Sequence, residues 1–408
     1  MFNEAKDLPA PEIDRELRIV RVTYDSDEAP RLAAYRDDRG CTTLPPGATA
    51  EDAAALPALA LDAPPALPVG PWPEGDPGKQ SVAPRAGYAG LGPVLSNAFD
   101  GDSYGDGTQT IGVVVVHEGR LVAERYREGF GPDTTYRTWS VAKTMTGALI
   151  GILVGRGDLQ LDGRAPIGEW NKDDPRAAIA LRHLLNMSSG LPRSGTVSYP
   201  VYFGGADSIA EVTRPPLEVA PGTRWHYANR DTLLLVRSMR AVMDDGEYQS
   251  FPYEALLWPI GMQHTTPEFD AFGNFVLSSQ VQSTARDLAR FGLLLLRDGS
   301  WNGEQILPPG WVDFMRTLAP ARSTGLVGLW RHGIIGLVGY GGQTWLPGSL
   351  PGIPADAFAA LGSRGQAIIV VPSQDLVIVR TGLDDEAGGV FFRIDQLTRD
   401  VVDALPPR

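Results

Sequence analysis

Two runs of β-forming residues, one in the first third of the chain and one near its end, most constrain the fold. Residues 111–126, IGVVVVHEGRLVAERY, are typical of two strands that turn at HEGR, where Gly119 supplies the flexible position. Residues 366–382, QAIIVVPSQDLVIVRTG, predict a second hairpin that turns at PSQD. We expect strands from both hairpins to share one sheet, so that the residues between them include an insertion.

That insertion is predicted to be mostly helical. From about residue 156 to 275, short helical patterns alternate with loops containing Gly and Pro, including RDTLLLVRSMRAVM at 230–243. A further long helix is indicated at 284–299, where Thr284 and Asp287 have the spacing of a capping box. Because 408 residues exceed the usual size of one core, we expect two lobes. Residues 86–155 plus 276–408 are assigned to an α/β lobe, and residues 156–275 to the helical one.

The N-terminal part has a different composition. Residues 17–25, LRIVRVTYD, alternate apolar and polar side chains and predict a strand. Ten prolines follow between Pro45 and Pro84, a density that favours an extended segment without regular secondary structure. We therefore expect residues 1–85 to be a strand and a proline-rich extension that wraps the rest of the protein.

Charge and composition exclude several classes of partner. The net charge of −13 disfavours nucleic acid and anionic membrane surfaces, because both would repel the protein. The five histidines lack the spacing of a metal site, so neither a metal nor another cofactor is expected. No stretch of about 18 apolar residues predicts a membrane span. As written, the chain is expected in the cytoplasm, or in the periplasm if a leader preceded it; the oligomeric state stays open.

The sequence contains two candidate nucleophilic serines. Ser103 lies in GDSYG, which matches the G-x-S-x-G pattern of a nucleophile elbow. That elbow needs a strand before the serine and a helix after it, whereas here a loop leads into a strand. Ser103 is therefore interpreted as a loop residue.

Ser140 has a more suitable context, in TWSVAKTMTGALIG at 138–151. It begins a strongly apolar predicted helix, where unpaired backbone N–H groups and the positive end of the helix dipole favour an oxyanion. Lys143 lies one turn further and projects beside it. The alternative is that Ser140 is a helix cap and Lys143 a solvated lysine. The apolar neighbours Val141, Ala142 and Met145 make solvation of Lys143 harder to explain.

A second pair of polar residues is Tyr227 and Asn229, in WHYANRD. On an extended segment, a spacing of two residues puts both side chains on one face, so both can point into a cleft. The alternatives are that Asn229 caps the helix that follows and that Tyr227 packs on Trp225.

Together these motifs resemble the penicillin-recognising serine hydrolases of the class C β-lactamase type. Ser140-Val-Ala-Lys143 followed by Tyr227-Ala-Asn229 is the pattern, and the closest likeness is to the esterase and nylon-oligomer hydrolase branch. Segments such as LRHLLNMSSGLP and STARDLARFGLLLLRDG occur in family order, and the likeness covers about residues 90 to 408. The resemblance implies an α/β fold of the serine β-lactamase/DD-peptidase type: an antiparallel sheet flanked by helices, with a mostly helical second lobe.

The third family motif, normally Lys-Thr-Gly, departs from the pattern. The equivalent stretch is Ala360-Leu361-Gly362-Ser363, which keeps the glycine but lacks the cation and hydroxyl that grip a β-lactam carboxylate. Efficient penicillin turnover is therefore not expected. The backbone N–H of Ser363 can still pair with that of Ser140 as an oxyanion hole, because that role needs no side chain.

The resemblance implies a serine acyl hydrolase that cleaves small-molecule esters, and linear amides, through an acyl-enzyme on Ser140. Lys143 and Tyr227 would relay the proton, although each alone needs roughly 4 kcal/mol to lose its own at neutral pH. Asn229 would hold Lys143 or the substrate. Tyr199 and Trp345 are candidates for an apolar pocket, and Arg364 for contact with a substrate carboxylate. The alternatives are a β-lactamase or D-alanyl peptidase, and a non-catalytic ligand-binding member.

Overall fold

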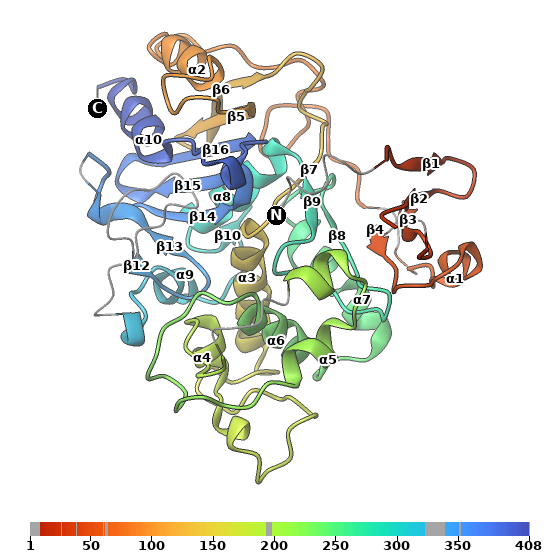
Figure 1. Ribbon diagram of the computed structural model, residues 1–408. Helices are drawn as coiled ribbons and strands as arrows, with labels where there is room; N and C mark the ends of the chain where they lie inside the picture. Colours follow the sequence, from red (N-terminus) through yellow and green to blue (C-terminus); the bar gives the residue numbers. More distant parts are fainter. Residues whose placement is uncertain are drawn as a thin grey trace.

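A seven-stranded antiparallel sheet forms the centre of the computed structural model, which describes residues 9–25, 27–37, 39–59, 61, 64–192, 198–322, 339–350 and 352–407. The strand order is β12-β13-β14-β15-β16-β5-β6 (Figure 1). The strands are β5 (Thr110–His117), β6 (Arg120–Tyr126), β12 (Gly339–Tyr340), β13 (Trp345–Leu346), β14 (Phe358–Gly362), β15 (Gln366–Val371) and β16 (Leu376–Gly382). Because β16 pairs with β5, the expectation that both hairpins share one sheet is confirmed.

Both faces of this sheet are covered by helices. All residues of β5 are buried, and alternate side chains enter two different cores. Val114 and Val116 pack in the core that contains α3 (Val141–Arg156) and α8 (Ala285–Leu296). Val113 and Val115 pack in the core formed with α2 (Leu91–Phe99) and α10 (Ile394–Asp403). The continuous valine run is thus explained by burial on both faces, and the predicted sheet flanked by helices is confirmed.

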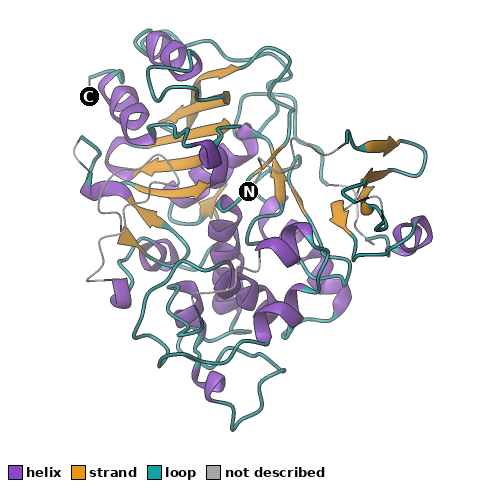
Figure 2. Cartoon of the chain, viewed as in Figure 1, coloured by secondary structure: helices purple, strands orange, loops and turns teal. Residues whose placement is uncertain are grey.

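Below the sheet in Figure 1 lies a part whose regular secondary structure is mainly helical, with long loops between the helices (Figure 2). It contains α4 (Leu181–Leu185), α5 (Ser208–Thr213), α6 (Asn229–Arg240), α7 (Asp245–Pro252) and the π-helical segments η3 (Ser198–Phe203) and η4 (Tyr253–Leu257). Helix α3 runs from the sheet into this part and packs on α6. The chain therefore places the start of α3 where the sheet and the helical part meet.

Two smaller sheets and one short helix complete the body of the protein. A three-stranded sheet has the order β7-β9-β8, with Arg137 opposite Gln282. Its strands are β7 (Tyr136–Arg137), β8 (Thr266–Pro267) and β9 (Val281–Ser283); the remaining elements are β10 (Ser300–Trp301), β11 (Glu304–Gln305) and α9 (Trp311–Met315). Since β7 ends directly before α3, this sheet sets the entry of the chain into that helix.

The N-terminal part contains more structure than the sequence predicted. It forms a four-stranded antiparallel sheet, β1 (Glu12–Asp14), β2 (Ile19–Val22), β3 (Arg31–Arg36) and β4 (Gly40–Thr43), to the right of the body in Figure 1. Helix α1 (Ala50–Ala55) lies inside the proline-rich stretch. The expectation of an extended segment without regular structure was wrong there, because Thr49 and Asp52 form a reciprocal capping box ahead of an alanine run.

The predicted capping box of α8 is only half present. The hydroxyl of Thr284 accepts a hydrogen bond from the backbone N–H of Asp287, at 3.2 Å. The carboxylate of Asp287 does not return the bond; it accepts from the N–H of His264, at 2.8 Å, and from the hydroxyl of Thr265, at 2.9 Å. The buried Asp287 carboxylate therefore connects the segment before β8 to α8 and does not complete the capping box.

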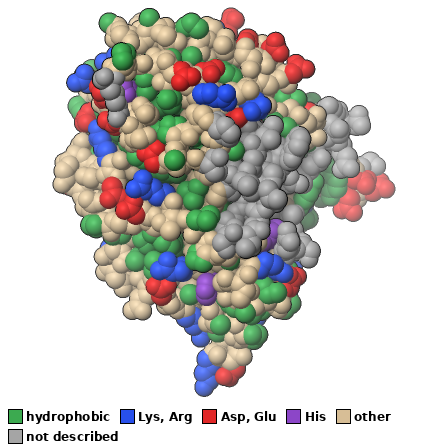
Figure 3. Space-filling view, turned by 90° about the vertical axis from the view of Figure 1, so that its left-hand side faces the viewer, with side chains coloured by type: hydrophobic (Ala, Val, Ile, Leu, Met, Phe, Trp, Pro, Cys, Tyr) green, Lys and Arg blue, Asp and Glu red, His purple; other side chains and the backbone are tan. Residues whose placement is uncertain are grey.

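The surface carries charges of both signs. On the face shown in Figure 3, acidic and basic side chains of the described residues lie interspersed, with small groups of hydrophobic side chains between them. No helix in the described part of the chain is long and apolar enough to cross a membrane.

Candidate active site

Ser140 stands at a sharp turn between β7 and α3. Trp139, directly before it, has a φ of 50°, a left-handed conformation that costs a non-glycine residue about 1–3 kcal/mol. Helix α3 begins at Val141, and the Ser140 side chain makes no capping hydrogen bond. Ser140 therefore occupies the N-cap position, as the alternative interpretation held, but its hydroxyl does not cap the helix and is available for other contacts.

Lys143 is buried beside that hydroxyl. Its Nζ lies 3.1 Å from the Oγ of Ser140 and 2.6 Å from the carbonyl oxygen of Ser278. Only 1% of its surface is exposed, so the interpretation as a solvated lysine is wrong. Burial lowers the pKa of Lys143 from 10.5 to about 7. The group can therefore exist as a neutral amine at neutral pH.

Tyr227 approaches the same two residues from the helical part. The Nζ of Lys143 lies 5.2 Å from the centre of its ring. Burial raises the pKa of Tyr227 above its ordinary value, and the nearby Ser140 side chain lowers it by less. The buried hydroxyl makes no well-directed hydrogen bond with any described residue. Tyr227 and Ser140 are therefore neighbours without a well-directed hydrogen bond between their hydroxyls.

The backbone of the Tyr227 segment is held by the segment after α4. The N–H of His226 donates to the carbonyl of Met187 at 2.8 Å. Ala228 is extended and is the N-cap of α6, so the interpretation of Asn229 as the cap is wrong: it is the first helical residue. Its proposed contact with Lys143 or substrate stays a prediction.

The ring of Trp345 packs against the ring of Tyr227. The two ring centres lie 5.1 Å apart, and the Tyr340 ring lies 4.7 Å from that of Trp345. Trp345 is 2% exposed, so in this structure its ring packs in an aromatic cluster rather than facing solvent. The cluster restricts the position of Tyr227, because Trp345 packs against its ring at an angle of 30° and Tyr340 packs edge to face with it at 85°.

Gly362 brings the end of β14 against the start of α3. A Cβ added at residue 362 would lie 2.4 Å from the carbonyl oxygen of Thr138 and 3.1 Å from the backbone nitrogen of Ser140. Only glycine permits this approach. Ser363 then begins a short 3₁₀ turn, Ser363–Gly365. This arrangement places the turn beside the nucleophile, and the role of the Ser363 N–H stays a prediction.

Two further predicted site residues lie at the edge of the cluster. Tyr199 belongs to η3 and is 48% exposed. Arg364 has a φ of 63°. Burial lowers the pKa of Arg137 to about 10, and repulsion from the nearby Arg364 cation makes a smaller contribution in the same direction. The structure therefore places a second arginine near the nucleophile.

Sequence reasoning missed Arg137 and Ser278. The Nη2 of Arg137 donates to the Ser279 hydroxyl at 3.0 Å, and its guanidinium stacks 3.8 Å from the centre of the Trp139 ring. The hydroxyls of Tyr202 and Ser278 lie 2.6 Å apart. Ser278 acts on Lys143 through its backbone carbonyl, which has no signature in the sequence. Arg137, in contrast, could have been noticed three residues before Ser140.

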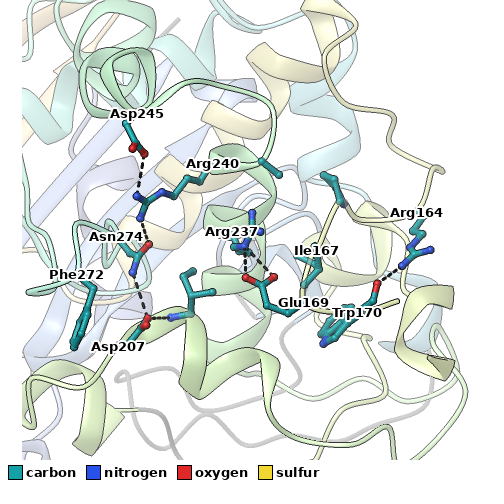
Figure 4. Close-up of a pocket in the computed structure, with 14 residues that line it drawn as sticks. Arg164, Ile167, Glu169, Trp170, Asp207, Arg237, Arg240, Asp245, Phe272 and Asn274 are labelled. Carbon is teal, nitrogen blue, oxygen red and sulfur yellow. Dashed lines mark hydrogen bonds and ion pairs between the residues drawn. The ribbon is translucent and has the colours of Figure 1, made fainter. Parts of the chain in front are cut away.

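Other candidate sites lie away from this cluster. Ser103 lies in a loop between α2 and β5, as expected, and donates to Asp100. A hollow of about 900 Å³ lies at the far end of α6 and includes none of the predicted catalytic residues (Figure 4). Two of its three arginines form ion pairs, Arg237 with Glu169 at 2.9 Å and Arg240 with Asp245 at 3.0 Å, and Arg164 donates to the carbonyl oxygen of Trp170 at 2.7 Å. Among the described residues, no group of three acidic, histidine or cysteine side chains is arranged to hold a metal.

Comparisons with known proteins identify the family of the chain. The family model described as Beta-lactamase matches residues 95–383. A 6-aminohexanoate-dimer hydrolase of Paenarthrobacter ureafaciens is 24% identical over 67% of this chain and 72% of its own. The structure of a family VIII carboxylesterase has a TM-score of 0.63 at 16% identity, over 80% of this chain and all of that one. The octameric penicillin-binding protein homologue from Pyrococcus abyssi has a TM-score of 0.59 at 18% identity, over 76% of each chain. The chain therefore belongs to the beta-lactamase family of serine hydrolases.

Proposed function

We propose that the protein cleaves carboxylic esters and linear amides through an acyl-enzyme on Ser140. The observation that carries this proposal is the distance of 3.1 Å between Ser140 Oγ and the buried Nζ of Lys143. A hydroxyl beside a neutral amine is an activated nucleophile, because the amine accepts the proton as the oxygen attacks.

Lys143 is the better candidate for the base in the free enzyme. Its pKa of about 7 removes most of the cost, on the order of 4 kcal/mol, of deprotonating an ordinary lysine at neutral pH. Tyr227 has a raised pKa and is therefore protonated in the same range. This difference favours the neutral amine over the phenolate, a choice that the sequence left open.

The proposed reaction has two stages, acylation of Ser140 and hydrolysis of the acyl-enzyme. Ser140 Oγ bonds to the substrate carbonyl carbon while its proton passes to Lys143, and the N–H groups of Ser140 and Ser363 stabilise the oxyanion. When the bond to the leaving group breaks, Tyr227 gives its proton to the leaving oxygen or nitrogen and regains one from Lys143. Water adds to the acyl-enzyme by the same route in reverse order, which releases the acid and restores Ser140.

Two properties bear on the substrate. The relatives include an amide hydrolase and a carboxylesterase, which supports esters and linear amides as the substrate class. The residues before the turn at Ser363 are Ala360, Leu361 and Gly362, all buried on β14, and none supplies a cation for a β-lactam carboxylate. We therefore expect esters to be turned over faster than penicillins or D-alanyl peptides.

A fluorophosphonate probe and a chromogenic ester test the proposal together. The parent protein is expected to be labelled at Ser140 and to hydrolyse p-nitrophenyl acetate, whereas Ser140→Ala loses both. Ser103→Ala is the matched control and retains both, because Ser103 lies in a loop away from the cluster. A folded parent that is neither labelled nor active would favour the non-catalytic alternative, and faster turnover of a cephalosporin than of any ester would favour the β-lactamase.

A further inference from the structure

The N-terminal sheet β1–β4 lies outside residues 95–383, which the family model matches, yet it contacts the segment beside the active site. On β3, the Nη2 of Arg31 donates to the carbonyl oxygen of Gly204 at 2.8 Å and to that of Phe203 at 3.4 Å. The same nitrogen lies 3.3 Å from the carbonyl oxygen of Leu44, just after β4. One guanidinium therefore joins the N-terminal sheet to the end of η3.

The two backbones also touch directly. Gly205 has a φ of 65°, and a Cβ added there would lie 2.2 Å from the carbonyl oxygen of Leu44. No other residue fits this approach without moving one of the chains. The backbone of Leu44 therefore packs closely against residues 203–205, and the hydrogen bonds of Arg31 fix the orientation of the two segments.

A second attachment runs through Glu268. Its carboxylate accepts from the N–H of Cys41 at 2.9 Å and from the side chain of Gln282 at 3.3 Å. Gln282 lies opposite Arg137 in the three-stranded sheet, and Glu268 attracts the Arg137 guanidinium. The N-terminal sheet therefore reaches the strand that leads into Ser140 as well as η3.

The η3 segment in turn borders the catalytic cluster. The hydroxyl of Tyr202 lies 2.6 Å from that of Ser278, whose carbonyl holds Lys143. The Phe203 ring lies 5.3 Å from the Arg137 guanidinium, which stacks on Trp139 beside the nucleophile. Phe203 is 38% exposed and Tyr199 48%, and their ring centres lie 6.4 Å apart. Two partly exposed aromatic rings therefore stand at the edge of the site.

We propose that the N-terminal sheet fixes η3 through Arg31, so that Tyr199 and Phe203 form a preorganised wall for the apolar acyl group of the substrate. The inference rests on the proposed esterase function and names its substrate class: esters with an extended apolar acyl chain. Fixing the rings before binding lowers the entropy lost when an acyl chain packs on them. Arg31 is thus a positioning residue that determines specificity without touching the reacting atoms.

Arg31→Ala and Arg36→Ala provide a matched pair for the test. Both arginines lie on β3, and Arg36 donates to the carbonyl oxygens of Ala53, at 2.6 Å, and Ala54, at 3.2 Å, within the N-terminal part. Hydrolysis of p-nitrophenyl octanoate and p-nitrophenyl acetate is compared. In Arg31→Ala, the KM for the octanoate is expected to rise about tenfold with kcat nearly constant, while the acetate parameters change little. Arg36→Ala is expected to keep the parent ratio of the KM values for the octanoate and the acetate. Arg31→Lys is expected to show a smaller rise in the KM for the octanoate than Arg31→Ala.

Hydrogen exchange gives a second measurement that does not depend on turnover. Amides in 198–206 should exchange faster in Arg31→Ala than in the parent and in Arg36→Ala. Equal losses on both esters, equal effects of the two arginine variants, or unchanged exchange in 198–206 would each overturn the inference. A parent that hydrolyses neither ester would refute the proposed function instead, and the exchange data would still decide whether Arg31 fixes η3.

Discussion

Lys143 Nζ lies closer to the carbonyl oxygen of Ser278, at 2.6 Å, than to the hydroxyl of Ser140, at 3.1 Å. The carbonyl therefore anchors the amine, and the longer contact is the one along which a proton can move. Because a carbonyl only accepts hydrogen bonds, it holds one N–H of a neutral amine and leaves the lone pair for Ser140. The protein thus orients its proposed base through a backbone group.

Replacement of Lys143 by Met tests that arrangement. Methionine fills similar space without an amine, so kcat/KM on p-nitrophenyl acetate should fall by about 10²–10⁴. Lys143→Arg should not restore activity, because a guanidinium stays protonated and cannot accept the serine proton. Lys172→Met is the control, since Lys172 is exposed and distant in sequence from the cluster. Near-parental rates in Lys143→Met would show that another group activates Ser140.

The pH dependence of acylation should report the state of Lys143. Below a pKa of about 7 the amine is protonated and cannot act as a base, so kcat/KM should increase with pH and level off above that value. Tyr227 stays protonated through this range because its pKa is raised. The measurement is the rate of fluorophosphonate labelling at Ser140 between pH 5 and 9. A rate that keeps rising up to pH 9 would point to the phenolate of Tyr227 instead.

Tyr227→Phe separates the two proton-transfer steps. Loss of the hydroxyl removes the group expected to protonate the leaving atom, so amides should suffer more than activated esters. We expect kcat to fall about 10²–10³ on a p-nitroanilide, with a smaller loss on a p-nitrophenyl ester, whose leaving group needs little protonation. The measurement is kcat for the p-nitroanilide and the p-nitrophenyl ester of the same acyl group, in the parent and in Tyr227→Phe. Trp225→Phe, which alters the same aromatic cluster without touching Tyr227's hydroxyl, is the control.

The proposed site residues could be named from the sequence because Ser140 and Lys143 lie within one helical turn, and because this pair followed by Tyr227-Ala-Asn229 resembles the motifs of a known family. Ser140 and Lys143 are linked by helical geometry alone, and the valine run of β5 already indicates a buried strand. Ser278 could not be found in this way, since it acts through a backbone carbonyl from a distant loop. Of the N-terminal sheet only the strand at 17–25, which contains β2, was predicted; the rest was missed, because its short strands depend on packing with residues such as Gly205 and Glu268 far along the chain.

Asp231 should make the stability of the protein depend on pH. It is 2% exposed in α6, and burial raises its pKa from 3.8 to about 7, although the N–H and hydroxyl of Ser189 and the charge of Arg230 lower it. Tyr340 also lies near Asp231, because the charge of the carboxylate contributes to the raised pKa of Tyr340, after burial and Tyr227. Between about pH 4 and 7 Asp231 holds a proton in the folded protein that it releases in the unfolded chain, so its contribution to the free energy of unfolding falls as pH rises.

Asp231→Asn removes that proton while its side-chain oxygen can still accept from the Ser189 hydroxyl, which lies 2.8 Å from Asp231. The free energy of unfolding of the variant minus that of the parent should therefore increase from pH 4.5 to 7.5, by on the order of 4 kcal/mol at most. Urea denaturation at several pH values measures this difference. The new amide group beside the Ser189 N–H destabilises the variant equally at every pH, so it does not affect how the difference changes with pH. Asp158→Asn, at an exposed position after α3, is the control. A difference that stays flat over this range would mean that Asp231 is already ionised in the folded protein.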